Sequence, residues 1–268
     1  MTMQIAITRS VSPAFANCEL TYLPRTPIDL ALAAQQHHAY EAALRALGCQ
    51  VVSLPADPGL PDSVFVEDPA VVLDGLAVIA RPGAAARRPE CATIAKALEV
   101  YRPLAYIQPP GTLEGGDVLL VGMKILVGLS GRSNLEGIRQ LAAIVAPYGY
   151  SVKGVSLRGC LHLKSALTVI GEELLLINPN WVEREEIEDG ILEENPAFKT
   201  NLDFVEVDQS EPHAANALRI GNGLIYPVNF ERTRERIERL GCQVLSVDVS
   251  EIQKAEGAVT CCSLLIAL

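Results

Sequence analysis

The chain has 268 residues, of which 49% are hydrophobic and 20% charged, and its formal net charge is −10. This length can bury a sizeable core, either as one large domain or as two small ones. No run of Lys and Arg exceeds two residues, and no apolar stretch approaches the length of a membrane span. A role on nucleic acid or at a membrane surface is therefore disfavoured, and the acidic balance suits a cationic small molecule.

The first nine residues lack the charged and then apolar pattern of a secretory signal. Seven cysteines, an odd number, occur without a CxxC pair or a His/Cys metal spacing. A chain of this length does not depend on disulfide staples, so reduced thiols in a cytoplasmic compartment are expected. We expect no cofactor and no metal, and at least one cysteine is free to be functional.

Two apolar runs joined by a glycine-containing turn occur four times along the chain. These hairpin patterns cover residues 69–80, 118–127, 166–177 and 216–226, and their turn glycines recur at intervals of about 47 to 50 residues. A helical pattern and then a short strand follow most of them. The predicted helices are 94–100, 135–146 and 233–240, and the matching strands are 104–107, 150–152 and 243–247. The acidic stretch 182–194 is a weaker helix pattern.

A fifth unit forms only if the two ends of the chain are joined. The apolar run 259–268 pairs with 4–8, and a helix over 31–47 and a strand over 50–54 complete it. The segments after the first and last helices are nearly the same, LGCQVVS from Leu47 and LGCQVLS from Leu240. In each, a glycine follows the helix as a left-handed cap.

Five ββαβ units closed by pairing of the N- and C-terminal strands make a five-bladed α/β propeller, predicted to be a single domain over residues 1–268. A generic α/β domain with common hairpins is the alternative. In a propeller, one loop from every unit reaches the central channel, so catalytic residues are expected to be scattered along the sequence.

Four dense polar segments interrupt the apolar pattern at or near hairpin entrances. In the first, Glu67 and Asp68 precede Pro69, and alternation along a strand predicts opposite faces and different partners for the two carboxylates. A carboxylate that faces a channel can bind a guanidinium. Solvated acids at a strand boundary are the alternative.

The second segment, GTLEGGDV from Gly111, places two glycines between Glu114 and Asp117, which allows close approach of the backbone. It also fits an ordinary acidic turn. The third, GCLHLKSA from Gly159, carries His162. The chain has four histidines, and His37 and His38 fall within a predicted helix. His162, at the entrance to a hairpin, is a better candidate for a general acid and base than these two, although many histidines in apolar settings are structural.

The fourth segment, GAVTCCS from Gly257, holds the adjacent cysteines Cys261 and Cys262. Placed at the start of a strand, they point to opposite faces, one to the channel and one to the core. A thiol in the channel near His162 is expected to have a lowered pKa, or one that a bound cationic substrate lowers. The other five cysteines fit buried or incidental positions.

These segments together resemble the dimethylarginine dimethylaminohydrolases, guanidine-modifying enzymes with the pentein fold, a five-bladed α/β propeller. The resemblance covers essentially the whole chain and rests on six motifs in the family's order. They are DSVFVEDP at 62–69, ARPGAAARR at 80–88, TLEGGDV at 112–118, SGRSN at 130–134, LHLKS at 161–165 and GAVTCCSL at 257–264.

The resemblance implies that Cys261 is the nucleophile and that His162, oriented by Glu114, is the general acid and base. Asp68 would hold the substrate guanidinium, with Glu67 in support. The α-carboxylate would be bound by Arg87 and Arg132. The α-amino end would meet Asp62 and the backbone near Leu20 and Ala255. Residues 18–28 resemble the family's mobile flap over the channel.

The implied reaction is hydrolysis of Nω-methylated arginine to citrulline and an amine through a Cys S-alkylthiouronium. A compact arginine deiminase or a citrulline-directed hydrolase of the same superfamily remains an alternative. The HxD pattern usual after the catalytic histidine of deiminases is replaced by His162-Leu163-Lys164. A non-catalytic propeller is a further alternative, which the joint presence of the four reactive side chains disfavours. The sequence leaves a homodimer open.

Overall fold

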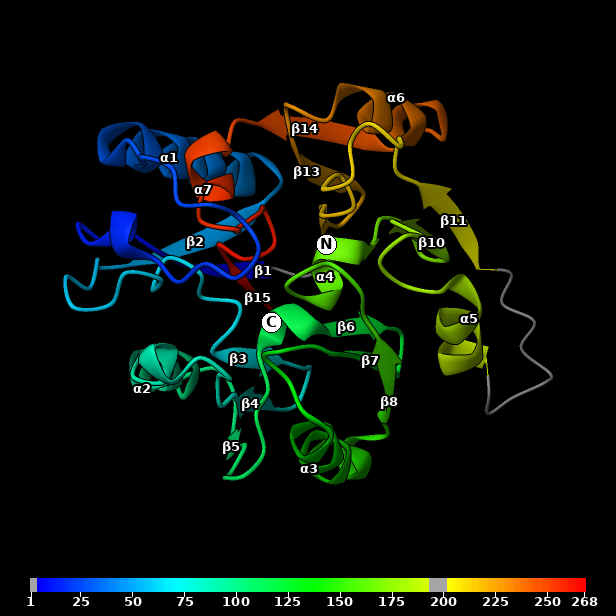
Figure 1. Cartoon of the computed structure of the whole chain (residues 1–268). Coiled ribbons are helices and arrows are strands. Elements are labelled where there is room, and N and C mark those ends of the chain that lie inside the picture. Colours follow the sequence, from blue (N-terminus) through cyan, green and yellow to red (C-terminus); the bar gives the residue numbers. More distant parts are fainter. Residues whose placement is uncertain (1–3, 193–201) are drawn as a thin grey trace.

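The structure, a computed structural model, describes residues 4–192 and 202–268. Figure 1 shows five small sheets arranged round a common centre, with the long helices α1, α2, α3, α5 and α6 on the rim. Each sheet has three strands. The predicted five-bladed α/β propeller is confirmed.

Every blade has the same topology, an antiparallel pair followed by a parallel third strand. The second blade consists of β3 (Ala70–Val72), β4 (Ala77–Ile79) and β5 (Leu104–Tyr106), and the third of β6 (Val118–Val121), β7 (Lys124–Leu129) and β8 (Ser151–Ser156). The fourth blade consists of β9 (Leu167–Val169), β10 (Leu174–Ile177) and β11 (Asp203–Glu206). The fifth consists of β12 (Leu218–Ile220), β13 (Gly223–Pro227) and β14 (Gln243–Val247). The four predicted hairpins are the antiparallel pairs. A parallel third strand needs a crossover, which the rim helices supply.

The first blade joins the two ends of the chain. Strand β1 (Gln4–Arg9) pairs antiparallel with β15 (Leu264–Ala267) and parallel with β2 (Cys49–Leu54). The closing strand is shorter than the predicted 259–268, because residues 259–262 turn toward the centre before it begins. The predicted closure of the ring is confirmed.

The rim helices are α1 (Leu30–Ala46), α2 (Glu90–Leu98), α3 (Leu135–Val145), α5 (Arg184–Leu192) and α6 (Glu231–Arg239). The prediction for α2, 94–100, ended two residues late and began four residues late, because Glu90 and Thr93 interrupt the apolar pattern of the first turn. The last residues of the predicted helix 182–194 lie outside the described part. Gly48 and Gly241 adopt φ of 92° and 84° after α1 and α6, as the repeated LGCQV segments predict.

The core is divided among five apolar clusters, and each joins two neighbouring blades with one rim helix. Between the first and second blades, for example, Ile7 and Ile266 pack with Ile79 and with Leu98 of α2. Burial of such side chains stabilises by about 1.5–3 kcal/mol each, so the ring holds its central loops in fixed positions. Within the described residues, no helix is long and apolar enough to span a membrane.

Candidate active site

The four polar segments lie at equivalent places, each directly before the first strand of a blade. Residues 61–69 turn into β3, 111–117 turn into β6, and 257–263 turn into β15. His162 precedes the short helix α4 (Leu163–Ala166), which leads into β9. Because the first strands of all blades surround the axis, these loops meet at the centre (Figure 1).

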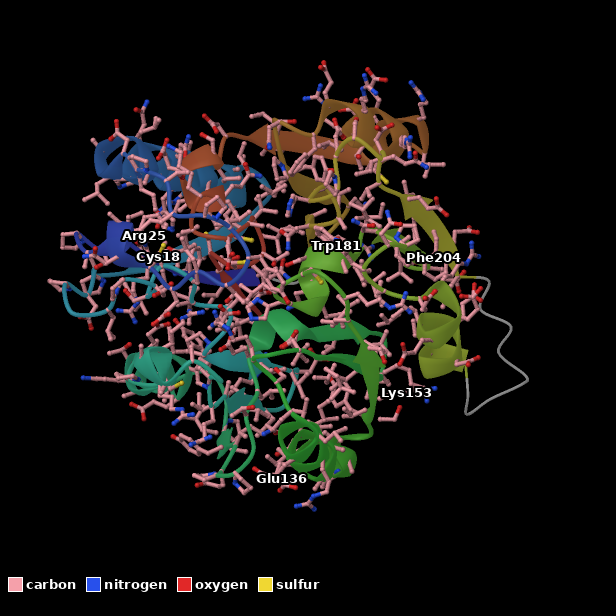
Figure 2. All side chains as sticks on the ribbon, viewed as in Figure 1. Cys18, Arg25, Glu136, Lys153, Trp181 and Phe204 are labelled. Carbon is pink, nitrogen blue, oxygen red and sulfur yellow. The ribbon has the colours of Figure 1, made fainter. Side chains whose placement is uncertain are left out.

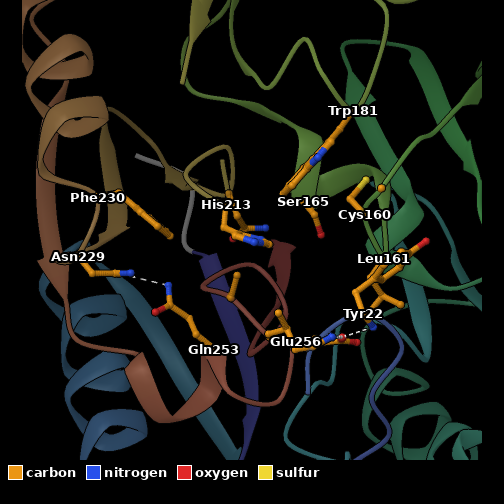
Figure 3. Close-up of a pocket in the computed structure, with 15 residues that line it drawn as sticks. Tyr22, Cys160, Leu161, Ser165, Trp181, His213, Asn229, Phe230, Gln253 and Glu256 are labelled. Atoms are coloured by element: carbon orange, nitrogen blue, oxygen red, sulfur yellow. Dashed lines mark hydrogen bonds between the residues drawn. The ribbon is translucent and has the colours of Figure 1, made fainter. Parts of the chain in front are cut away.

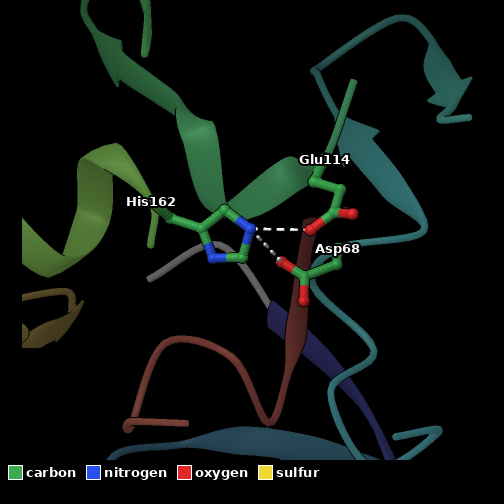
Figure 4. Close-up of side chains that lie close together, drawn as sticks. All are labelled: Asp68, Glu114 and His162. Atoms are coloured by element: carbon green, nitrogen blue, oxygen red, sulfur yellow. Dashed lines mark hydrogen bonds and ion pairs between the residues drawn. The ribbon is translucent and has the colours of Figure 1, made fainter. Parts of the chain in front are cut away.

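Three of the predicted side chains form one buried cluster (Figure 4). His162 Nε2 lies 2.7 Å from Glu114 Oε2 and 4.0 Å from Asp68 Oδ1. Burial alone lowers the pKa of His162, but the charges of Asp68, Asp117 and Glu114 outweigh it and raise that pKa to about 9. The pKa of Glu114 is lowered against burial by its hydrogen bond to His162. His162 is therefore a cation at neutral pH and donates to Glu114.

The two glycines of the second segment make this cluster sterically feasible. A Cβ on Gly116 would lie 2.8 Å from both Asp68 Oδ1 and His162 Nδ1, and one on Gly115 would lie 2.1 Å from the Glu67 carbonyl oxygen. Real Cβ atoms do not approach so closely, so this loop needs glycine at both positions. The expected close approach of the backbone is confirmed.

Cys261 and Cys262 have different surroundings, as predicted, but for another reason. They lie in turns before β15 rather than at a strand start, so strand alternation does not separate them. Cys262 is 2% exposed and belongs to the core between the first and fifth blades, whereas Cys261 is half-buried and lines the central cavity.

The expectation that neighbouring His162 lowers the pKa of the Cys261 thiol is wrong for the unliganded protein. Burial, followed by the charges of Glu67 and Asp68, raises it well above its usual range. The thiol is therefore neutral at rest, and a cation is needed beside it to form the thiolate.

The cavity brings together residues from distant parts of the sequence. It is lined by Glu19, Asp62, Phe65, Asp68, Arg87, Arg132, Leu161, His162, Ala255, Glu256, Gly257 and Cys261. Three predicted site residues do not line it. Glu114 lies behind His162, Leu20 packs beside the apolar core, and Glu67 faces elsewhere.

Glu67 is directed away from the cavity by two strong partners. Its carboxylate accepts hydrogen bonds from Lys164 Nζ at 2.6 Å and from Thr260 Oγ1 at 2.8 Å. Asp68 instead pairs with Arg87. The two adjacent carboxylates thus have different partners, as expected, although they lie in turns and not on a strand. Glu67 ties together loops of three blades behind the reacting groups.

The two arginines predicted to bind a carboxylate are already paired with acids. Arg87 Nη1 donates to Asp68 Oδ2 at 2.6 Å, and its Nη2 and Nε donate to Glu90. Arg132 Nη1 lies 3.4 Å from Glu114 Oε1. Arg87 is 4% exposed and Arg132 is 9% exposed. Arg87 therefore also holds Asp68 in place, a contact that the sequence does not reveal.

The flap, residues 18–28, lies beside this cavity and is held by hydrogen bonds at several points. Asp62 accepts from the Glu19 backbone N–H at 3.1 Å, and Arg132 Nη2 donates to Thr21 Oγ1 at 3.0 Å. Arg25 Nη2 donates to the Cys18 carbonyl oxygen at 2.6 Å, and the two residues are labelled side by side in Figure 2. These contacts hold the flap beside the cavity, which Glu19 lines; that it closes over the channel and is mobile stays a prediction.

Glu256 is a site residue that the sequence did not indicate. Its carboxylate accepts from the backbone N–H groups of Thr21, Tyr22 and Leu23 at 2.9, 2.5 and 2.5 Å. Among the described residues other than glycine, it alone has a positive φ, 59°. Glu256 lines both the active-site cavity and a second pocket. Figure 3 shows it in the second pocket, which Trp181, Phe230 and His213 also line. No local pattern predicts a contact over more than 230 residues.

Asp68, Glu114 and His162 are also the kinds of side chain that bind metals, and their ligand atoms lie within 4.8 Å of one another. They come from three loops, so no spacing along the sequence reveals the group. Two donors on one tetrahedral zinc ion, each about 2.0–2.1 Å from it, lie more than ~3 Å apart, whereas Nε2 and Oε2 are 2.7 Å apart. Arg87 and Arg132 already neutralise the carboxylates. This geometry is that of a charged hydrogen-bond network.

A propeller of five ββαβ blades with a cysteine, a histidine and two carboxylates at its axis defines the chain as a pentein. The chain belongs to the dimethylarginine dimethylaminohydrolase family, since residues 25–268 match the family described as "N,N dimethylarginine dimethylhydrolase, eukaryotic". It is 38% identical to N(G),N(G)-dimethylarginine dimethylaminohydrolase of Pseudomonas aeruginosa over 88% of this chain and 89% of that protein. Identity to the protein of the same name from Streptomyces coelicolor is 36%, over 98% of this chain and 97% of that one.

Solved structures of the same family have a similar fold. A mutant of the Pseudomonas aeruginosa enzyme complexed with citrulline superposes with a TM-score of 0.88 and 35% identity, covering 99% of this chain and 100% of that one. A family member described as an adduct with S-methyl-L-thiocitrulline gives a TM-score of 0.86 at 35% identity, with the same coverage. The N-terminal domain of a cyanobacterial arginine dihydrolase, 19% identical, has a TM-score of 0.86 over 99% of this chain and 98% of that one, and it shares the fold.

Proposed function

We propose that this protein hydrolyses asymmetric dimethylarginine and monomethylarginine to citrulline, releasing dimethylamine or methylamine. The observation that carries the proposal is the buried His162–Glu114–Asp68 cluster, which opens onto the same cavity as Cys261. The citrulline complex of the related enzyme supports the same substrate class.

In this proposal the substrate guanidinium binds to Asp68 and replaces part of the pairing of Asp68 with Arg87 and His162. Asp68 fixes the plane of the guanidinium and sets its carbon against Cys261 Sγ. Arg132 and Arg87 bind the α-carboxylate, and Asp62 with the backbone near Leu20 and Ala255 meets the α-amino group. Glu67 acts from behind, through Lys164 and Thr260.

Substrate binding supplies the positive charge that the resting thiol lacks. Burial and the charges of Glu67 and Asp68 raise the pKa of Cys261. A guanidinium beside the sulfur opposes this shift, so the thiol releases its proton to solvent and becomes a thiolate only once the substrate is bound. This coupling restricts the reactive nucleophile to the complex and protects the free enzyme from unwanted alkylation.

The thiolate adds to the guanidinium carbon, and the proton of His162 moves to the nitrogen that carries the methyl groups. The C–N bond breaks and the amine leaves, so the carbon is held as an S-alkylthiouronium on Cys261. Neutral His162 then takes a proton from water, whose oxygen adds to the same carbon. The C–S bond breaks and the hydroxyl proton of the adduct passes to solvent, which regenerates the thiolate and protonated His162 and releases citrulline.

The seven cysteines are free in the structure, and the mechanism needs a reduced thiol. We therefore place the protein in the cytoplasm, and propose that residues 1–268 form one catalytic domain, since both ends of the chain share the first blade. Whether it acts as a monomer or a homodimer does not alter the site, because every residue used here comes from one chain.

The test is to incubate the protein separately with asymmetric dimethylarginine, monomethylarginine, arginine and citrulline, and to identify the amine released. Dimethylamine or methylamine, formed in equal amount with citrulline, is expected. Ammonia as the preferred product would point to a deiminase or a citrulline-directed hydrolase, and no product from any compound to a binding protein. Activity that is lost on chelation and restored by zinc would contradict the metal-independent mechanism.

A further inference from the structure

Asp117 is a buried carboxylate that lies outside the cavity and has no part in the proposed chemistry. It directly precedes β6 and is 0% exposed. Because Val118 pairs with Val127 across the hairpin, Asp117 faces Gly128. A Cβ on Gly128 would lie 2.9 Å from Asp117 Oδ1, so the glycine leaves the space that this carboxylate occupies.

Both oxygens of Asp117 accept hydrogen bonds from other loops of the site. Oδ2 accepts from the hydroxyls of Ser130 and Ser133, each at 2.6 Å, and Oδ1 accepts from the Leu163 backbone N–H at 3.0 Å. Leu163 follows His162 directly. The carboxylate therefore ties the end of β7 to the loop that carries the histidine.

The two serines extend these contacts to further site residues. Ser130 Oγ accepts from the Arg132 backbone N–H at 3.0 Å, and Ser133 Oγ accepts from the Glu114 backbone N–H at 3.0 Å. A serine hydroxyl has one donor and two acceptor lone pairs. Once the donor is directed to Asp117, the lone pairs are fixed on the backbone groups beside Arg132 and Glu114.

We propose that Asp117 is a positioning residue that holds Glu114, Arg132 and His162 in register through Ser130, Ser133 and the Leu163 amide. Its importance for turnover rests on the proposed function. A buried carboxylate with only neutral donors is costly to desolvate, so a purely structural tie would be better served by a neutral side chain. The charge has a second effect, since it acts on His162 together with Asp68 and Glu114.

The test compares Asp117→Asn, which keeps the shape but removes the charge, with Ser133→Ala, which keeps the charge but removes one hydroxyl. Asp208→Asn is the matched control, because Asp208 also accepts from a serine hydroxyl, that of Ser210, but lies in the fourth blade's outer loop. NMR titration of the His162 ring, a signal identified by its absence in His162→Gly, measures its pKa without any substrate.

In Asp117→Asn the pKa of His162 is expected to fall from about 9 by about one unit, and kcat by about 10- to 100-fold. Ser133→Ala is expected to lower kcat about tenfold while the pKa of His162 stays unchanged. Asp208→Asn should leave the pKa of His162 unchanged and should change kcat by no more than about twofold.

An unchanged pKa of His162 together with an unchanged kcat in Asp117→Asn would overturn the proposal. If that variant does not fold, an unchanged kcat in Ser133→Ala would overturn it instead. Because the titration needs no turnover, a fall in the pKa of His162 would support the contacts of Asp117 even if dimethylarginine proved not to be the substrate.

Discussion

The inner site and the flap are held by different kinds of contact. In the inner site, Asp68, Glu114 and His162 are each at most 5% exposed and are bonded to groups from three blades. In the flap, Tyr22 and Leu23 are 55% and 36% exposed. The flap is held by separate hydrogen bonds along its length, to Asp62, Arg132 and Glu256. The inner groups are thus preorganised, whereas the flap can be released one contact at a time.

Glu256 is where the two regions meet. Its positive φ costs about 1 kcal/mol or more for a residue with a side chain, and its carboxylate gathers three consecutive flap N–H groups. Lys254 donates to the carbonyl oxygen of Pro27 at the end of the flap, and Glu251 accepts from the backbone N–H of Asp29, which follows it. The same short segment therefore lines the cavity and fastens the flap. This comparison predicts that substitutions in the inner site lower activity strongly and that substitutions at the flap lower it only slightly.

The largest effect is expected from Cys261→Ser, because a serine hydroxyl in this buried acidic setting does not supply an equivalent nucleophile. Activity with dimethylarginine should fall by at least about 10³-fold. Cys262→Ser, the matched control one residue away, should keep most activity and lose about 1 kcal/mol of stability, since Cys262 packs in the core. Release of the amine measures the activity, and thermal unfolding measures the stability. The reverse ranking would remove Cys261 from the mechanism.

A smaller effect is expected from Gly116→Ala, which adds one carbon to the inner site. The new Cβ would lie 2.8 Å from Asp68 Oδ1 and from His162 Nδ1, and the displacement should lower kcat about 10- to 100-fold. Gly131→Ala is the control, because a Cβ there meets nothing within 4 Å. Equal kcat values for the two variants would mean that the inner site tolerates displacement, contrary to the comparison.

The smallest effect is expected from Glu256→Gln, which removes the charge that fastens the flap. KM should rise about 3- to 10-fold, which corresponds to the loss of about 1 kcal/mol of hydrogen bonding, with little change in kcat. Chymotrypsin should also cleave after Tyr22 more rapidly. Glu235→Gln, which removes a Glu235–Arg239 pair on the surface of α6, is the control. A fall in kcat with unchanged KM and unchanged proteolysis would place Glu256 with the inner site instead.

Much of this architecture follows from local patterns. Paired apolar runs, turn glycines and the repeated LGCQV caps are properties of neighbouring residues, and they predict the blades and the closure of the ring. The reactive residues were recognisable because they lie in motifs at equivalent loops. Other contacts join segments that are distant in the sequence, so no local pattern predicts them. They are the contacts of Arg87 with Asp68, of Asp117 with Ser133 and of Glu256 with the flap. The raised pKa of Cys261 depends on burial, which a sequence motif does not fix.

The strand-alternation argument shows a further limit. It separated Cys261 from Cys262 and Glu67 from Asp68, yet both pairs lie in turns. Their side chains diverge because each turn passes between the cavity and the core. The prediction that the two members of each pair differ in their surroundings was right, but the backbone conformation assumed for it was wrong.

The central claim is that Cys261 forms a covalent intermediate whose breakdown needs His162. The most direct measurement is the intact mass of His162→Gly after incubation with S-methyl-L-thiocitrulline, whose thiol leaving group has less need of a proton from the histidine than an amine does. A stable adduct with the mass of the ligand less methanethiol, mapping to the Cys261 peptide, is predicted, with none in the variant that also carries Cys261→Ser. An adduct on another cysteine, or product formation at the wild-type rate without any adduct, would contradict the account.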